Sequence, residues 1–109
     1  MSASIYICPL SALPEELRKC GADHLLSLMS PNMPVETPNG LQPENHLTLH
    51  FNDILESRDG LVPPTSNDLE KLITFLTEDW NRKKPLLIHC WFGVSRSTAA
   101  SFIAACLLR

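Results

Sequence analysis

A short apolar run that ends in a histidine and a cysteine constrains the fold of this chain more than any other feature. The run is Leu86-Leu87-Ile88, and His89 and Cys90 follow it directly. The chain then reads Trp-Phe-Gly-Val-Ser-Arg-Ser-Thr and becomes almost wholly apolar up to residue 109. An apolar run without alternation is typical of a central strand covered on both faces, and the last stretch is typical of a buried helix. The pattern therefore predicts a strand, a tight loop and a helix.

The predicted loop combines the groups that are needed to bind and attack a tetrahedral oxyanion. Backbone N–H groups and the dipole at the start of a helix favour an anion. The same surroundings, with the cation of Arg96 nearby, favour a thiolate at Cys90 that can act as a nucleophile. The guanidinium fork of Arg96 can bind two phosphate oxygens at once. Gly93 allows the sharp turn, and Ser97 is near enough in sequence to donate a hydrogen bond to the sulfur.

These residues resemble the active-site signature of the protein tyrosine phosphatase superfamily, in which a histidine, a cysteine, five residues, an arginine and a serine follow one another. The stretch Gly93-Val94-Ser95-Arg96-Ser97 is most similar to the dual-specificity phosphatases and their bacterial relatives. The resemblance implies that Cys90 is the nucleophile, that Ser97 stabilises the departing thiolate and that His89 orients the loop. The phosphate-binding loop that it implies consists of Trp91, Phe92, Gly93, Val94, Ser95 and Arg96.

Four other interpretations of this pattern stay open. The plainest is a buried structural cysteine beside a surface arginine. A second is a thiolate-loop enzyme of the rhodanese or arsenate reductase type, although those families usually have a shorter or differently ordered loop. A third is a catalytically weak module that binds phosphate groups. The last is an interaction fragment whose exposed C-terminal helix recruits a partner.

A phosphatase of this kind also needs an acid, because phosphoryl transfer to a cysteine expels an alkoxide or phenoxide that has to be protonated. Residues 46–51 alternate between polar and apolar and predict a strand. Asp53 follows this strand at once, where active-site groups of open α/β sheets are often placed. It resembles the general-acid position of the dual-specificity phosphatases. Asp59 and Glu56 are its rivals in the same loop.

The first half of the chain predicts alternating strands and helices. Residues 5–8 and 24–28 predict two strands with a helix between them, an order that favours a parallel pair. The helix is expected to begin near Pro14 and to end at Gly21. The proline-rich residues 30–44 predict an irregular segment at the rim, which we interpret as a connector rather than as a wall of the substrate cleft.

A second helix is predicted after Pro63-Pro64, starting at Thr65-Ser66. One face of it is expected to be buried, because apolar residues recur at helical spacing. These residues are Leu69, Leu72, Ile73, Leu76 and Trp80. We expect Trp80 in the core rather than at the substrate. The fold class expected is α/β, with a central, mostly parallel sheet of about four strands flanked by helices.

The resemblance covers almost all of the 109 residues, which suffice for one domain with one core. The family continues past the position of Arg109 with helices that cover the apolar C-terminal helix. We therefore expect residues 1–109 to form a single phosphatase catalytic domain that lacks its C-terminal helices. The uncovered helix would then favour self-association.

The composition of the chain indicates where the protein is located and which classes of partner it can bind. The net charge is −3 and no stripe of basic residues is present, which argues against a nucleic-acid partner. No apolar run reaches the roughly 18 residues of a membrane span, and we expect a cytoplasmic protein without a membrane partner. The irregular spacing of Cys8, Cys20, Cys90 and Cys106 predicts reduced thiols. The cysteines other than Cys90 are expected to be buried apolar residues; an oxidative disulfide between one of them and Cys90 is the alternative.

The expected function is hydrolysis of a phosphomonoester through a cysteinyl-phosphate intermediate. The substrate expected is a phosphorylated protein, phosphotyrosine before phosphoserine or phosphothreonine, or an aryl phosphate. No basic residue stands at the variable positions of the loop, which argues against inositol lipids. We expect neither a cofactor nor a metal. His46 and His50 would share one face of a strand, but at about 13 Å apart they could not share a metal ion.

Overall fold

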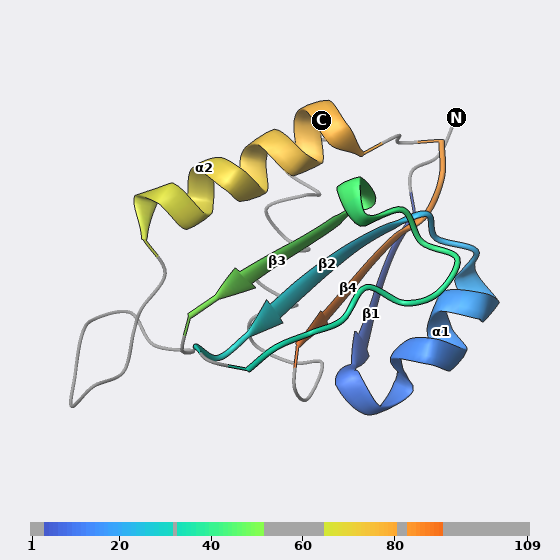
Figure 1. Cartoon of the computed structure of the whole chain (residues 1–109). Helices are drawn as coiled ribbons and strands as arrows, with labels where there is room; N and C mark the ends of the chain where they lie inside the picture. The colour runs from blue at the N-terminus through green and yellow to red at the C-terminus, as the bar shows by residue number, and fades with distance from the viewer. Residues whose placement is uncertain (1–3, 32, 52–64, 81–82, 91–109) are drawn as a thin grey trace.

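The computed structural model of this chain describes residues 4–31, 33–51, 65–80 and 83–90. In chain order the described elements are β1 (Ile5–Pro9), η1 (Leu10–Ala12), α1 (Leu13–Cys20), β2 (His24–Met29), η2 (Pro43–Asn45), β3 (His46–His50), α2 (Ser66–Thr74), η3 (Phe75–Asp79) and β4 (Leu86–Cys90). The short elements η1 and η2 are 3-10 turns, and η3 is a π-helical turn that continues α2. Helix α2 lies over one face of the sheet and α1 over the other (Figure 1).

The four strands form one sheet in the order β1-β4-β2-β3, and all three neighbouring pairs are parallel. This confirms the α/β class and the parallel sheet of about four strands. The expected pairing of β1 with β2 is wrong, because β4 lies between them: Leu86 pairs with Ile5 on one side and with His24 on the other. All five residues of β4 are buried, and a strand that is apolar on both faces is most stable in the centre of a sheet.

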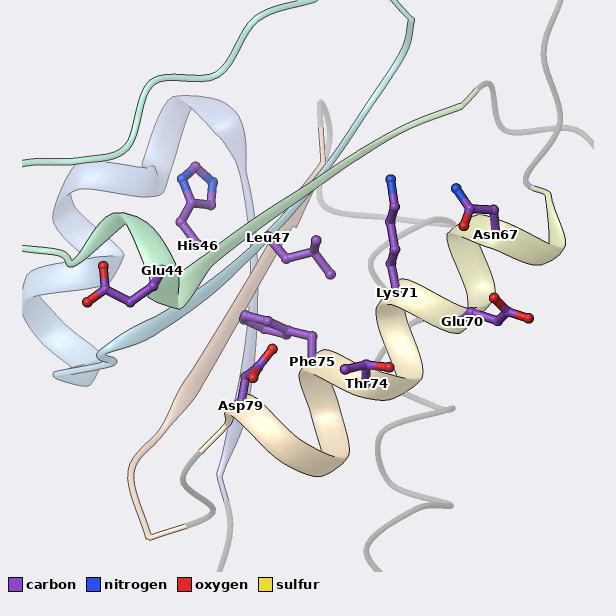
Figure 2. A pocket seen from close by; sticks show the side chains of 9 residues that line it. All are labelled: Glu44, His46, Leu47, Asn67, Glu70, Lys71, Thr74, Phe75 and Asp79. Atoms are coloured by element: carbon purple, nitrogen blue, oxygen red, sulfur yellow. The ribbon is translucent and has the colours of Figure 1, made fainter.

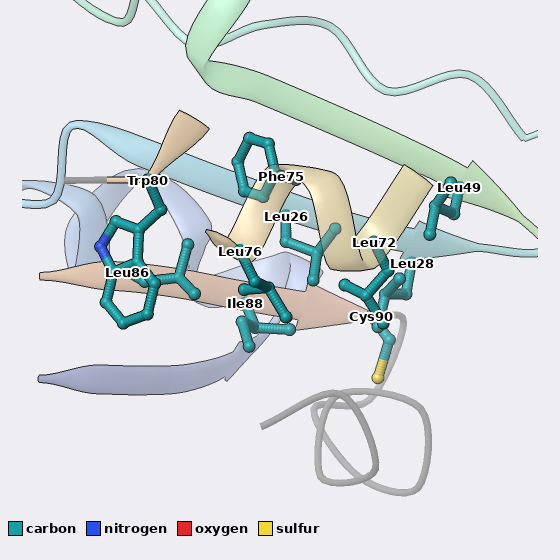
Figure 3. Packing of buried hydrophobic residues seen from close by; sticks show 10 residues of the cluster. All are labelled: Leu26, Leu28, Leu49, Leu72, Phe75, Leu76, Trp80, Leu86, Ile88 and Cys90. Carbon is teal, nitrogen blue, oxygen red and sulfur yellow. The ribbon is translucent and has the colours of Figure 1, made fainter. Parts of the chain in front are cut away.

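The larger core lies between the sheet and α2 (Figure 3). Its buried members are Leu26, Leu28, Leu49, Leu72, Phe75, Leu76, Trp80, Leu86, Ile88 and Cys90. Trp80 is in this core, as expected, and its indole Nε1 donates a hydrogen bond of 3.0 Å to the carbonyl oxygen of Lys84. We refer to this set as the α2 cluster.

The buried face of α2 differs from the predicted one. Leu72 and Leu76 are buried, but Leu69 is 46% exposed and Ile73 is 38% exposed, whereas Phe75 is 3% exposed. Each residue turns a helix by about 100°, so Phe75 and Ile73 lie on opposite sides of Leu72. Burying the larger aromatic ring therefore turns Ile73 towards solvent.

Helix α1 ends where its sequence predicts, and only α2 has a side-chain cap at its start. Thr65 and Asp68 form a capping box on α2: Thr65 Oγ1 accepts from the Asp68 N–H at 3.1 Å, and Asp68 Oδ2 accepts from the Thr65 N–H at 2.9 Å. Helix α1 ends at Gly21, whose φ of 69° lies in the left-handed region. Its N-cap, Ala12, makes no side-chain hydrogen bond.

The smaller core lies between the sheet and α1, and its buried members are Cys8, Leu13, Leu25, Leu41 and Leu87. Between β2 and η2 the described residues form turns but no helix or strand, as the prolines predict. Within the described parts of the chain, no helix has the length and apolar character that crossing a membrane requires.

Candidate active site

Two of the predicted site residues, His89 and Cys90, are described by the structure, and both lie on β4. Cys90 is the last residue of this central strand, so it lies at the carboxyl edge of the sheet. Its side chain belongs to the α2 cluster, is 2% exposed and lies at the arrowhead end of β4 (Figure 3). Because side chains alternate along a strand, His89 points to the opposite face, on the side of α1, where it is fully buried.

The remaining predicted site residues lie outside the described residues. They are Asp53 with its rivals Glu56 and Asp59, and Trp91, Phe92, Gly93, Val94, Ser95, Arg96 and Ser97. Two described residues stand directly before the segments that contain these predicted site residues. Phe51 follows β3 and Cys90 ends β4, and because the strands are parallel both lie at the same edge of the sheet. The chain therefore continues towards Asp53 and towards the predicted loop from one edge.

A chain of polar side chains starts at His89 and runs from β4 across β2 to β3, on the same face of the sheet as α1. Ser27 Oγ lies 2.6 Å from Nε2 of His89 and 2.7 Å from Nε2 of His46. Nδ1 of His46 lies 2.8 Å from Thr37 Oγ1, and Thr48 Oγ1 is 3.3 Å from Nε2 of His46. The strand register explains the arrangement, since Ser27 is the direct partner of His89 on β4 and of Thr48 on β3. We call His89, Ser27, His46 and Thr37 the polar chain.

Both histidines of the polar chain have lowered pKa values. The pKa of His89 is lowered from 6.5 to about 4, chiefly by burial and to a lesser extent by the nearby His46, while the backbone of Cys90 acts in the opposite direction. Burial also lowers the pKa of His46. Both rings are therefore neutral near neutral pH, and each carries one N–H. Nδ1 of His89 is buried and has no hydrogen-bond partner of good geometry among the described residues.

Ser27 and Thr37 are not among the site residues that the sequence predicts, and the sequence suggests His46 only as a possible metal ligand, which its distance from His50 excludes. A signal for Ser27 was present, because it is the one hydroxyl residue in an otherwise apolar run, Leu25-Leu26-Ser27-Leu28-Met29. A hydroxyl group in such a strand is buried on folding and needs a partner. Nothing in the local sequence identifies His46 and His89 as that partner, because they stand 19 and 62 residues away.

Cys8 behaves as the expected buried apolar residue. Its pKa is raised to about 11, chiefly by burial and to a lesser extent by Glu16 and the other two described cysteines. Cys8 lies in the core under α1, whereas the side chain of Cys90 lies under α2. The sheet thus separates the two thiols, which argues against a disulfide between them. Cys20 is only half-buried, unlike its prediction, and Cys106 lies outside the described residues.

A surface pocket of about 390 Å³ lies away from Cys90, between β3 and α2 (Figure 2). Its lining mixes acidic, basic and apolar side chains: Glu44, His46, Leu47, Asn67, Glu70, Lys71, Thr74, Phe75 and Asp79. His46 and Leu47 are the first residues of β3, at the amino edge of the sheet, whereas Cys90 lies at the carboxyl edge. The pocket is therefore not the candidate active site. Among the described residues, no group of three or more His, Cys, Asp or Glu side chains could hold a metal ion.

The fold is that of a known phosphatase structure. The crystal structure of the Cydia pomonella PTP-2 phosphatase is similar to this chain with a TM-score of 0.64, over 93% of this chain and 63% of that chain, at 20% sequence identity. At this identity the likeness is one of fold alone, and the chain spans 63% of the length of that phosphatase chain. No family model matches the sequence, and no curated protein matches it.

Proposed function

We propose that this chain is a cysteine-dependent phosphomonoester hydrolase of the protein tyrosine or dual-specificity type. One observation carries the proposal: the cysteine of a Cys-x5-Arg pattern is the last residue of the central strand, in a sheet whose fold is similar to that of a phosphatase. Ligand and catalytic groups of open parallel sheets lie at the carboxyl ends of the strands. Cys90 is the reactive group at that edge.

The proposed reaction has two steps. The thiolate of Cys90 attacks phosphorus, a sulfur–phosphorus bond forms, and the bond from phosphorus to the ester oxygen breaks. Asp53 gives its proton to the leaving oxygen and then takes a proton from the water that cleaves the cysteinyl-phosphate. Arg96 and the loop amides bind the non-bridging oxygens and stabilise the charge of the transition state. Ser97 donates a hydrogen bond to the thiolate that leaves in the second step.

The proposed substrate is a phosphorylated protein or an aryl phosphate, and the proposed location is the cytoplasm. The sequence has no cluster of basic residues that would favour a nucleic-acid partner, and its net charge is −3.

We further propose that residues 1–109 form one catalytic domain that associates with itself through its apolar C-terminal stretch. Light scattering of the chain over a range of concentrations tests this association, and a monomer at every concentration would contradict it.

Hydrolysis of p-nitrophenyl phosphate at mildly acidic pH tests the proposed activity. Cys90→Ser is expected to abolish turnover, whereas Cys20→Ser, which alters a half-buried thiol at the end of α1, is expected to leave it unchanged. Asp53→Asn is expected to reduce kcat by about 10² to 10⁴, the usual contribution of a general acid. If Asp53→Asn keeps full activity, the acid is Asp59 or Glu56, and the corresponding variants identify it.

A second measurement separates a weak binding module from an enzyme. Orthovanadate resembles the transition state of phosphoryl transfer, and its binding by the parent chain can be followed by calorimetry. If the chain binds orthovanadate but does not hydrolyse p-nitrophenyl phosphate, it is a phosphate-binding module and not an enzyme. If it neither binds orthovanadate nor hydrolyses the substrate, the proposed function is wrong. Alkylation of Cys90 by iodoacetate, with protection by phosphate, adds a check that does not depend on turnover, because the nucleophile has to be open to small anions.

A further inference from the structure

The surface pocket between β3 and α2 has no part in the proposed reaction, and its lining combines apolar and charged groups in an ordered way. Leu47 of β3 and Phe75 of η3 lie in its middle (Figure 2). Charged side chains surround them, three of them acidic and one basic: Glu44, Glu70, Asp79 and Lys71. With a volume of about 390 Å³, the pocket has room for one or two side chains of another molecule.

The four charged side chains of the pocket are exposed and make no ion pair with one another. Among the described residues, ion pairs join Lys19 to Glu15 and His24 to Asp23, all of them outside the pocket. Three carboxylates and one ammonium group give the pocket a net negative charge near neutral pH. Charge complementarity therefore favours a cationic occupant, and the apolar middle favours one that also carries an apolar side chain.

The pocket lies beside an open edge of the sheet, because β3 is the outermost strand on its side. The backbone N–H of Phe51 donates to the carbonyl oxygen of Met29 at 2.9 Å, and backbone groups point to alternate sides along a strand. The backbone groups of Thr48 and His50 therefore point away from β2. They have no hydrogen-bond partner within the described parts of the chain. An edge of this kind can pair with an added strand.

The spacing of the carboxylates fits the side chains of such an added strand. Asp79 lies with Glu44 at one end of the pocket and Glu70 lies at the other end (Figure 2). The helical residues from Glu70 to Asp79 cover about 13 Å at 1.5 Å per residue, which is the length of about four strand residues. Alternate side chains of an added strand point towards α2. Basic residues at its first and fifth positions would meet the two acidic ends, and an apolar residue at the third would meet Leu47 and Phe75.

We propose that the outer edge of β3 and this pocket together form a docking groove for an extended, basic segment of the protein substrate. The binding of a basic segment does not depend on the proposed function, whereas its being part of a substrate rests on it. The five residues of β3 cover roughly 17 Å and end at the edge of the sheet that carries Cys90. The phosphorylated residue is therefore on the order of five to ten residues from the docked segment.

The binding of an unphosphorylated peptide tests the groove without the active site. The probe is a labelled ten-residue peptide with arginine, leucine and arginine at three successive alternate positions and threonine elsewhere. Its control has glutamate in place of arginine. Fluorescence anisotropy at low ionic strength is expected to show binding of the arginine peptide at least about tenfold tighter than that of the control, and salt is expected to reduce the difference. Equal affinities would overturn the proposal.

Neutral variants of the pocket residues test whether the peptide binds in this place. Glu44→Gln and Asp79→Asn are each expected to weaken binding of the arginine peptide about two- to fivefold, the usual effect of one exposed ion pair. Lys71→Gln is expected to tighten it by a similar factor, which a partly unfolded variant would not do. Glu78→Gln is the matched control, because Glu78 is exposed beside Asp79 but lies outside the pocket. An equal loss in Glu78→Gln would mean attraction by overall charge alone and would overturn the proposal.

Amide hydrogen exchange tests whether the bound peptide pairs with β3. The N–H groups of Thr48 and His50 are expected to exchange at least about tenfold more slowly when the arginine peptide is bound, because they then donate to its backbone. Those of Leu47 and Leu49, which already donate to β2, are expected to change little. Peptide binding without slower exchange at Thr48 and His50 would overturn the strand pairing.

Two phosphotyrosine peptides test the link to the substrate. Both carry the phosphorylated residue about eight residues from the docking segment, one with arginines in the segment and one with glutamates. The arginine peptide is expected to have a KM about tenfold lower at equal kcat, because docking adds binding energy away from the reacting atoms. Glu44→Gln is expected to reduce this advantage and to leave the hydrolysis of p-nitrophenyl phosphate, which is too small to reach the groove, unchanged.

The measurements distinguish the possible failures. If the parent chain lacks turnover, the proposed function fails, while peptide binding and hydrogen exchange still decide on the docking groove. If both phosphotyrosine peptides are hydrolysed with the same KM although the unphosphorylated arginine peptide binds in the groove, the segment belongs to another partner, and its assignment to the substrate is wrong.

Discussion

The two faces of β4 follow opposite rules, although their residues alternate along one strand of five residues. Leu86, Ile88 and Cys90 face α2 and pack in an apolar cluster. Leu87 and His89 lie on the face of the sheet that carries α1. On this face the His89 ring is hydrogen-bonded to Ser27, and Ser27 is in turn hydrogen-bonded to His46. The apolar face is stabilised by burial of apolar surface, which tolerates small shifts of the side chains. The polar face is stabilised by hydrogen bonds, whose distances and angles do not tolerate such shifts.

The difference shows how such a sheet can combine stability with precise placement of one residue. Burial of apolar surface is non-directional, so the α2 cluster fixes the position of β4 but not the orientation of a peptide at its end. The polar chain adds direction at the residue before Cys90. Substitutions on the apolar face, on the polar face and at the starts of the covering helices are therefore expected to have effects that decrease in that order.

Leu76→Ala tests the apolar face and is expected to have the largest effect on stability. Leu76 is 1% exposed in the centre of the α2 cluster, so its truncation leaves a cavity and lowers the free energy of unfolding by about 2–5 kcal/mol. Leu69→Ala on the same helix is the matched control, because Leu69 is 46% exposed, and is expected to cost less than about 0.5 kcal/mol. Urea denaturation measures both, and equal losses would mean that the helix buries the face predicted from sequence.

The polar face is expected to make stability depend on pH. The pKa of His89 is about 4 in the folded chain and about 6.5 in the unfolded chain, so the unfolded state binds more protons between these values. The contribution of neutral His89 is thus intact above pH 6.5 and is lost as the pH falls towards 4. Between pH 7.5 and pH 5 the loss is roughly 2 kcal/mol, and His46 adds to it in the same direction.

The control for this pH effect separates His89 from the carboxylates that titrate over the same range. The free energy of unfolding of the parent and of His89→Gln is measured by urea denaturation at pH 7.5 and pH 5. The parent is expected to lose more than the variant, whereas Leu76→Ala is expected to keep the pH dependence of the parent. A parent and a His89→Gln variant with the same pH dependence would show that His89 is not held neutral by burial.

Local patterns in the sequence predicted the positions of the strands along the chain well, but they predicted poorly which strands lie next to each other in the sheet. The runs at residues 5–8, 24–28 and 46–51 and the run before Cys90 are strands within a residue or two, because periodicity and punctuating Pro and Gly residues are local signals. The position of β4 between β1 and β2 depends on which strands gain most from being covered on both sides. That is a property of the whole sheet, and adjacency in sequence was the wrong guide to it.

The same limit explains which site residues could be predicted. Cys90 and His89 belong to one short motif, so the sequence identifies them together, and the structure places Cys90 at the expected end of its strand. Ser27 and His46 become neighbours of His89 only through the strand register. Likewise, Ile73 seemed apolar enough for the core, but only the packing of Phe75 decides which side of α2 is covered.

The helices that cover the two faces differ at their first residues, which gives the smallest expected effect. Thr65 caps α2 with a side-chain hydrogen bond, so Thr65→Ala is expected to lower the free energy of unfolding by about 1 kcal/mol. Thr65→Ser keeps the hydroxyl group and is expected to retain most of the stability. Urea denaturation of the two variants measures the difference.

Ala12→Ser provides the converse test on α1. An N-cap side chain reaches the free N–H groups of the first turn from an extended backbone, such as that of Thr65 with φ −108° and ψ 168°. Ala12 has φ −98° and ψ 0°, and the helix is entered through the 3-10 turn η1. A serine hydroxyl group at this position is therefore directed away from the N–H groups, and the substitution is expected to give no gain in stability. A gain in stability as large as the loss in Thr65→Ala would mean that the residue before α1 can adopt the extended geometry. The start of α1, on the face that carries the polar chain, would then be less constrained than the start of α2, on the apolar face.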